Sequence, residues 1–252
     1  MVHTNYLVAL VCCIFLFDAR YHKAAVYSES LSLYGLLGLL LPSLFMVLSK
    51  SISSTGIIKT DIAQRFSLII PILISVFVWN QSLSFYKGLG LIMGFIALGF
   101  ILYKKQNTQD IITLWPVFVL LGYGFVDVLF KKVALIEHIP YTDSLLVIFS
   151  FAFAVSCIIG GYLFITKKIT YSKSSVLWGV FLGLLNFTNI YTYIKAHKIL
   201  NDNPAVVFAT MNFGVIVLSA LVGYYYFKEN INKYNTIGII LSLIAIALIT
   251  LF

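Results

Sequence analysis

Charged side chains are scarce in this sequence. Asp, Glu, Lys and Arg make up 10% of the 252 residues, whereas hydrophobic residues make up 61% and the mean hydropathy is +0.99. A soluble domain has about 25% charged and about 45–50% apolar residues. The shortage of charge therefore excludes an ordinary soluble domain, and the apolar surface needs a lipid bilayer as its solvent.

Cysteines and clustered catalytic residues are scarce as well. The three cysteines lie inside apolar runs without metal-ligand spacing, so we expect neither a disulfide framework nor a metal site. The four histidines are far apart and no Gly-x-Ser-x-Gly or His-x-x-x-His motif is present. We therefore predict that the protein is not an enzyme and uses no cofactor. The net charge of +8 comes from basic residues at the ends of apolar runs, which indicates contact with lipid headgroups and not with nucleic acid.

Long apolar runs fill most of the chain. They do not alternate with polar residues, so helices are favoured over a barrel. Most approach the roughly 20 residues that a helix needs to cross a bilayer. The fold class that we predict is all-α, a polytopic transmembrane bundle of about nine helices. The nine segments run over residues 4–17, 31–49, 56–79, 86–103, 112–130, 144–165, 175–199, 204–227 and 236–251.

The sequence repeats itself at an offset of 148 residues. This shift aligns residues 34–102 with residues 182–250 without a gap. Coincidences of leucine mean little in apolar helices, but several others are more specific. They are Gly35 with Gly183, Lys50 with Lys198, Tyr86 with Tyr234, Gly90 with Gly238 and Ala97 with Ala245. We therefore predict two half-repeats, 1–111 and 112–252, within one integral membrane domain.

The same offset predicts how the two halves are related. The fifth segment opens near residue 112, and its counterpart would precede the first residue, so we expect the first half to lack its first helix. Each half then derives from five helices, and an odd number inverts the second half relative to the first. Inverted-topology repeats are common in secondary transporters, whose substrate sites lie near the bilayer midplane.

The end of the sequence carries its most characteristic motifs. Asn203-Pro-Ala-Val-Val-Phe begins a helix that runs to Phe227-Lys-Glu229, and Tyr234-Asn-Thr-Ile-Gly238 begins the last one. Gln64-Arg-Phe-Ser-Leu-Ile-Ile-Pro71 is the matching part of the first half, although Gln81 stands where the second half has Glu229. On these motifs the sequence resembles the EamA-like, ten-helix branch of the drug/metabolite transporter superfamily. The resemblance implies ten helices, a central cavity between the halves, and export or uptake of metabolites by alternating access.

Asp127 is the outstanding ionisable residue inside an apolar segment. A charge at the bilayer centre costs roughly 2.5–3.5 kcal/mol on insertion scales, so it needs a partner or a water-filled cavity. One interpretation is a cavity-lining carboxylate that binds substrate or a proton. The alternative is a helix-end acid paired with Lys131, four residues later, which contributes only a few tenths of a kcal/mol.

A second polar cluster, Asp61, Gln64 and Arg65, opens the third segment. Asp61 and Arg65 are four residues apart and therefore share a helix face. Arg65 lies ~13 Å below the helix entrance, so it either snorkels to the headgroups or faces the cavity, where its guanidinium suits a carboxylate or phosphate. We predict that Arg65 and Asp127 approach each other in at least one state. An anionic substrate group, helped by protonation of Asp127, would then displace the carboxylate.

Three amide side chains complete the predicted substrate-binding set: Asn186, Asn189 and Asn212. Asparagine in a membrane helix often hydrogen-bonds to a neighbouring helix for about 0.6 kcal/mol, so structural contacts are the alternative for each.

Together these patterns predict a secondary transporter of a small polar or amphipathic metabolite in a bacterial cytoplasmic (inner) membrane. Its expected partners are the small-molecule substrate and the bilayer, and a proton or substrate gradient would supply the drive. The alternative is a lipid-linked substrate flippase or a non-transporting membrane assembly subunit. A hydrophilic substrate needs polar residues lining a sealed cavity, whereas a lipid substrate needs a lateral opening between helices.

Overall fold

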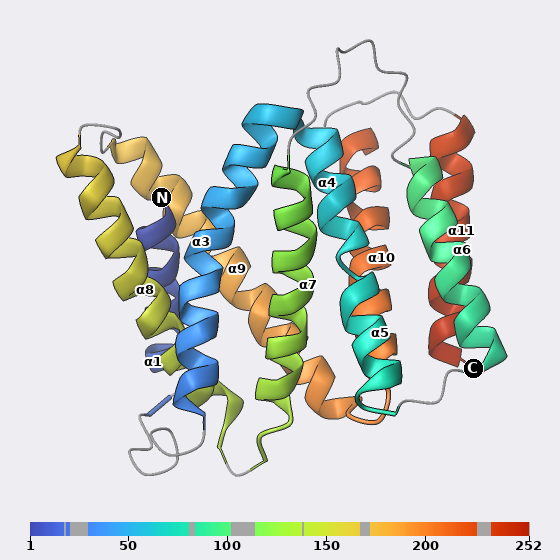
Figure 1. Ribbon diagram of the computed structural model, residues 1–252, viewed down its shortest axis with the longest axis horizontal. Helices are drawn as coiled ribbons and strands as arrows, with labels where there is room; N and C mark the ends of the chain where they lie inside the picture. Colours follow the sequence, from blue (N-terminus) through green and yellow to red (C-terminus); the bar gives the residue numbers. More distant parts are fainter. Residues whose placement is uncertain are drawn as a thin grey trace. The chain divides into compact units, whose positions relative to one another are not determined.

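The computed structural model describes residues 1–17, 19–20, 30–80, 84–101, 114–137, 139–166, 172–225 and 233–251. All regular structure in these ranges is α-helical (Figure 1), which confirms the all-α prediction. The helices are α1 (Val2–Phe17), α3 (Leu31–Thr55), α4 (Ile57–Phe66), α5 (Ile69–Phe77), α6 (Phe85–Ile101), α7 (Trp115–Ala134), α8 (Tyr141–Ile165), α9 (Lys173–Ile199), α10 (Pro204–Tyr225) and α11 (Lys233–Leu251). Each predicted segment corresponds to one helix, except that the segment over 56–79 is divided into α4 and α5. The turn residues Gln81 and Glu229 lie outside the described residues.

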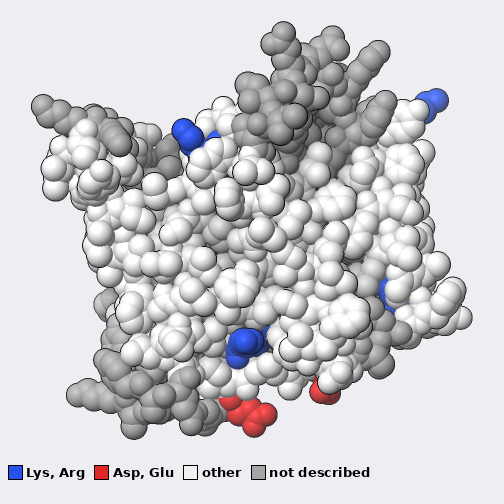
Figure 2. Space-filling view, viewed as in Figure 1, with Lys and Arg blue, Asp and Glu red and all other residues white. Residues whose placement is uncertain are grey.

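The exposed surface of these helices is apolar. Four stretches, 31–55, 60–77, 141–165 and 233–251, are long and apolar enough to cross a membrane. Phe15, Phe77 and Phe85 each expose more than three-quarters of their surface. Among the described residues on the face drawn in Figure 2, most atoms belong to uncharged residues. Lipid is the solvent that suits such a surface, because contiguous apolar patches of this extent are rare on soluble monomers.

The helix bounds follow the 148-residue offset. The start of α6 at Phe85 corresponds to the start of α11 at Lys233, and the end of α1 at Phe17 corresponds to the end of α8 at Ile165. Because α8 is the longer of the two, α1 is equivalent only to its second part. The inverted relation of the two halves stays a prediction.

The helices form two compact units, and each unit draws on both halves of the sequence. Unit 1 comprises Met1–Val47 and Leu129–Ile199, and unit 2 comprises Leu48–Val128 and Leu200–Phe252. The division between the units falls inside α3 and α7. Residues distant in sequence therefore build each core.

In unit 1, α1 packs against both α8 and α9. Small residues allow this close approach, as is common where membrane helices meet. A Cβ atom at Gly183 of α9 would lie 2.8 Å from the Asn5 carbonyl oxygen and 2.8 Å from Cβ of Val8. Glycine at position 183 therefore allows the backbones of α9 and α1 to come this close. At its repeat equivalent Gly35, no atom of the described residues lies within 4 Å of the corresponding position.

In unit 2, the longest interface joins α6 to α11. A Cβ atom at Gly90 would lie 3.0 Å from the Ala245 carbonyl oxygen and 2.7 Å from the Ile249 side chain. Ala97 and Ala245 are repeat equivalents, and both are fully buried. Small residues at matching places in the two halves therefore let the two last helices pack closely.

Replacement of Gly183 by alanine tests the packing of unit 1. We expect a free energy of unfolding lower by about 1–3 kcal/mol, because the added methyl group overlaps the backbone of α1. Gly35→Ala is the matched control and should keep or slightly raise the thermal midpoint, because its methyl group would have no atom of the described part of the chain within 4 Å. Thermal unfolding of both variants in detergent measures the difference. Equal midpoints would contradict the close approach of α1 to α9.

Candidate functional site

The candidate site is built around an interruption between α4 and α5. Proline has no N–H to donate, and its ring clashes with the carbonyl of the residue four positions earlier. Pro71 therefore prevents a regular helical bond at Ser67. The chain tightens there: Leu68 N donates to the Arg65 carbonyl at 3.2 Å, and Ile70 N donates to the Ser67 carbonyl at 3.0 Å. The predicted segment over 56–79 thus forms one membrane-crossing stretch, 60–77, whose hydrogen-bond ladder is irregular at Ser67 and Leu68 while both residues keep helical backbone dihedrals.

Helix α7 packs against this interruption. A Cβ atom at Gly124 would lie 2.8 Å from the Ser67 carbonyl oxygen and 2.6 Å from the Ile70 side chain. Only glycine allows the two backbones to come so close without a shift. The Ser67 hydroxyl turns back and donates to the Gln64 carbonyl of its own helix. Helix α7 therefore covers one side of the interruption.

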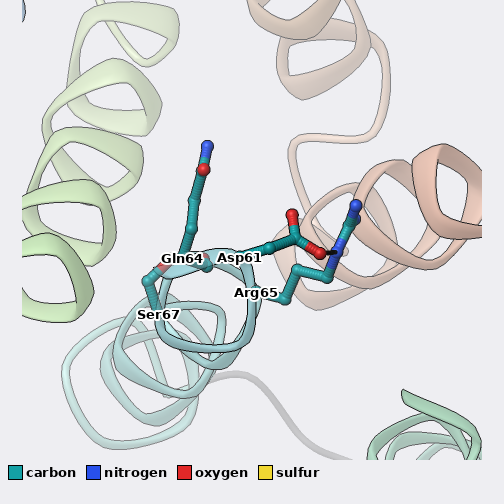
Figure 3. A network of polar contacts seen from close by, with 4 residues as sticks. All are labelled: Asp61, Gln64, Arg65 and Ser67. Carbon is teal, nitrogen blue, oxygen red and sulfur yellow. Dashed lines mark hydrogen bonds and ion pairs between the residues drawn. The ribbon is translucent and has the colours of Figure 1, made fainter. Parts of the chain in front are cut away.

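Asp61 and Arg65 form an ion pair on α4. Arg65 Nε donates to Asp61 Oδ2 at 2.8 Å, across the predicted i, i+4 spacing. The Arg65 side chain is 14% exposed and the Asp61 side chain is 32% exposed. Because protein covers most of Arg65, the snorkelling alternative is disfavoured. Gln64 projects from a different face of α4 than this pair (Figure 3).

Asp127 follows Gly124 by three residues on α7, about one helical turn from the covered interruption. Its side chain is half-buried. Lys131 lies four residues further on, so the helical spacing places both residues on one side of α7. Arg65 pairs with Asp61 in this structure, and the approach of Arg65 to Asp127 stays a prediction for another state.

The three predicted asparagines lie in different places. Asn212 of α10 is half-buried in unit 2, and its Nδ2 donates to the Phe208 carbonyl of the same helix at 3.0 Å. Asn212 is the repeat equivalent of Gln64, so each half places one amide at this level. Asn186 belongs to unit 1, where its Nδ2 donates to Asn5 Oδ1 at 3.2 Å. This bond ties α9 to α1 and agrees with a structural role. Asn189, also in unit 1, is exposed.

Sequence reasoning missed three features of this region. Pro71 is a visible signal for the interruption, whereas nothing local marks Gly124 as the residue that covers it. The third feature is a contact of Asn203, which belongs to the characteristic Asn-Pro motif. Lys87 Nζ donates to Asn203 Oδ1 at 2.7 Å and ties the start of α6 to the turn before α10.

Comparison with known proteins identifies the architecture. The model of the EamA-like transporter family matches residues 111–251. An uncharacterized protein of Haemophilus influenzae is 42% identical over 223 residues, which cover 87% of this chain and 75% of that relative. This chain belongs to the EamA-like transporter family. One crystal structure, at 14% sequence identity, has the same fold with a TM-score of 0.77, over 99% of this chain and 86% of that one.

Membership of the EamA-like transporter family confirms the resemblance found in the sequence. It makes the chain an integral membrane protein of a transporter family. It also fits a protein that is not an enzyme. The family does not identify the substrate, so the evidence for a substrate class has to come from the residues of the site.

Replacement of Pro71 by alanine tests the origin of the interruption. Alanine supplies the missing N–H and removes the ring, so one further helical bond becomes available, worth about 1 kcal/mol. We expect the amides of residues 68–72 to exchange with deuterium about fivefold more slowly. Hydrogen exchange measured by mass spectrometry gives the rates, with Ser219→Ala at the equivalent place in α10 as the control. Unchanged exchange in Pro71→Ala would show that proline does not cause the interruption.

Proposed function

We propose that this EamA-like protein is a secondary transporter of a small polar or amphipathic metabolite in a bacterial cytoplasmic membrane. It moves its substrate by alternating access around a site in unit 2. The observation that carries this proposal is the interrupted helix α4–α5, which bears an ion pair and packs against the helix that carries Asp127. Family membership supports transport, and the interruption supports the place of the site.

An interrupted helix suits a transporter for two physical reasons. Discontinuous helices bring backbone groups and helix ends to the substrate sites of many secondary transporters. The interruption is also an inexpensive place to bend, because the regular hydrogen-bond ladder is already absent there. At Gly124 the backbone of α7 lies directly against the Ser67 carbonyl and the Ile70 side chain. In the proposed mechanism this place acts as the hinge, and the charged group of Arg65 lies two residues before it.

Arg65 is the group that we propose to bind substrate. Its contact with Asp61 occupies Nε, and the guanidinium carries four further N–H donors in a planar fork. This fork suits a carboxylate or a phosphate better than a lysine does. Asp61 holds the fork in place while the site is empty. A substrate anion would take up the remaining donors, or replace Asp61.

Asp127 is the group that we propose to couple transport to protons. In a low-dielectric interior an unpaired carboxylate favours its protonated form, and a nearby cation favours the ionised form. When a substrate anion engages Arg65, the positive charge available to Asp127 decreases. Asp127 then binds a proton more readily, so substrate and proton bind together and cross together.

Transport by charge-neutral variants tests this mechanism. Proteoliposomes are loaded with an isotopically labelled metabolite extract, and the exchanged compounds are measured by mass spectrometry between pH 5.5 and 8.5. We expect Arg65→Gln to lose at least about tenfold in rate, because a buried charge-assisted contact contributes about 1.5–3 kcal/mol. Asp127→Asn should keep some exchange but lose its pH dependence. Lys132→Gln changes an exposed charge on α7 and is the control.

Two outcomes would overturn the proposal. One is a normal rate with unchanged pH dependence in Asp127→Asn. The other is exchange of a lipid-linked substrate without exchange of any soluble metabolite, which would favour the flippase alternative.

A further inference from the structure

One face of α9, in unit 1, changes its chemistry along the helix. Its first part is apolar and exposed, with Leu177, Phe181 and Leu185 at spacings of four residues. The same face then continues with four exposed polar residues, which we call the polar face of α9: Thr188, Asn189, Thr192 and Lys195. Lipid suits the first part of this face, and the second part needs a different surrounding.

Asn189 is the residue of the polar face that lipid suits least. Its side-chain amide has no hydrogen-bond partner among the described residues. It lies ten residues before the end of α9 at Ile199, ~15 Å along the helix axis. If the 27 residues of α9, ~40 Å long, extend equally beyond both sides of a hydrocarbon layer of ~30 Å, Asn189 lies ~10 Å inside that layer. Hydrocarbon offers no partner to a free amide, so its transfer out of water is costly.

The other members of the polar face do not decide between lipid and water. Thr188 Oγ1 donates to the Leu184 carbonyl at 2.9 Å, and Thr192 Oγ1 donates to the Thr188 carbonyl at 2.8 Å. The helix itself therefore satisfies both hydroxyls. Lys195 lies four residues before the end of α9, from where its long side chain reaches the headgroups. Asn189 is thus the decisive residue, and the repeat offers a second, independent comparison.

The first half of the chain has aliphatic residues at the four equivalent positions. The 148-residue offset pairs the polar face of α9 with Leu40, Leu41, Leu44 and Val47 of α3. Leu44 is buried and the other three are half-buried. A surface in contact with lipid would show the reverse, because polar side chains of membrane helices face the protein interior or water. The copy that is covered is aliphatic and the copy that is exposed is polar, as expected of a surface in contact with water.

We propose that water reaches the polar face of α9, and that this face guides an anionic substrate into the protein from the end of α9. Water supplies the hydrogen bonds that the Asn189 amide lacks. Lys195 stands at the outer end of the face, and its ammonium has no ion-pair partner among the described residues. Its charge attracts metabolites that carry a carboxylate or a phosphate. This inference rests on the proposed transport function, to which it adds a route in unit 1 and a preference for negative charge.

Reaction of introduced cysteines with charged, membrane-impermeant methanethiosulfonates tests whether the face is wet. Asn189→Cys and Thr192→Cys are made in a Cys157→Ser background, because the other two native cysteines are buried. The full chain is held in lipid nanodiscs, which leave both membrane surfaces open to the reagent, and mass spectrometry gives the rates. We expect both cysteines to react at least about tenfold faster than Phe181→Cys, because the reaction needs a thiolate, which hydrocarbon disfavours. Phe181 is the matched control, since it is 55% exposed on the apolar part of the same face.

Lys195→Gln tests the preference for negative charge in the Asn189→Cys protein. The two positions are six residues apart, ~9 Å along the helix, where a unit charge changes the local concentration of a charged reagent about twofold in water. We expect the anionic sulfonatoethyl reagent to react about twofold more slowly and the cationic trimethylammonioethyl reagent about twofold faster. Lys173→Gln removes an exposed charge at the other end of α9 and should change neither rate.

Two results would overturn the inference. One is reaction of Asn189→Cys and Thr192→Cys as slow as that of Phe181→Cys in folded protein, which would place the polar face in lipid or against another chain. The other is an unchanged ratio of anionic to cationic rates in Lys195→Gln. Transport is measured separately in proteoliposomes. Fast, charge-dependent labelling without exchange of any metabolite would leave this wet face standing and overturn the proposed function alone.

Discussion

Every backbone N–H and C=O inside a bilayer must find its partner within the protein, because hydrocarbon offers none. Pro71 makes this requirement impossible to meet with a regular helix at Ser67. The N–H groups of Leu68 and Ile70 instead donate to carbonyls three residues earlier. Helix α7 covers the interruption at Gly124. The short helix α4 ends there, and its ion pair lies just before the irregular hydrogen bonds. The position of the charged group in unit 2 thus depends on one missing hydrogen-bond donor.

The two halves of the chain answer the same constraint differently. The repeat equivalent of Pro71 is Ser219, and α10 runs without interruption from Pro204 to Tyr225. The two equivalent amide side chains differ in the same way: Gln64 belongs to an interrupted helix and Asn212 to a continuous one. One half therefore supplies a helix that can bend, and the other supplies a rigid partner against which α5 packs. In the alternating-access cycle that we propose, this asymmetry gives the two halves separate tasks.

Much of the fold could be predicted because hydropathy, helix period and the repeat offset are local properties of the sequence. The spacing of Asp61 and Arg65 predicted a shared helix face for the same reason, and the two side chains form an ion pair there. The interruption was harder to predict from the sequence, because a proline does not always divide a helix. Pro42 lies inside α3, and that helix stays continuous. Whether a proline divides a helix depends on what covers the freed groups. The contrast between Gly35 and Gly183 is of the same kind, since the repeat predicts equal roles and only the neighbours differ.

The transport rate of Pro71→Ser tests most directly whether the interruption serves transport. Serine restores the donor and copies the residue of the other half, while the ion pair and Asp127 stay in place. Measured in proteoliposomes and normalised to folded protein, the exchange rate should fall at least about tenfold, because the helix would have to break a regular bond in each cycle. An undiminished rate in a well-folded Pro71→Ser protein would contradict the role given to the interrupted helix.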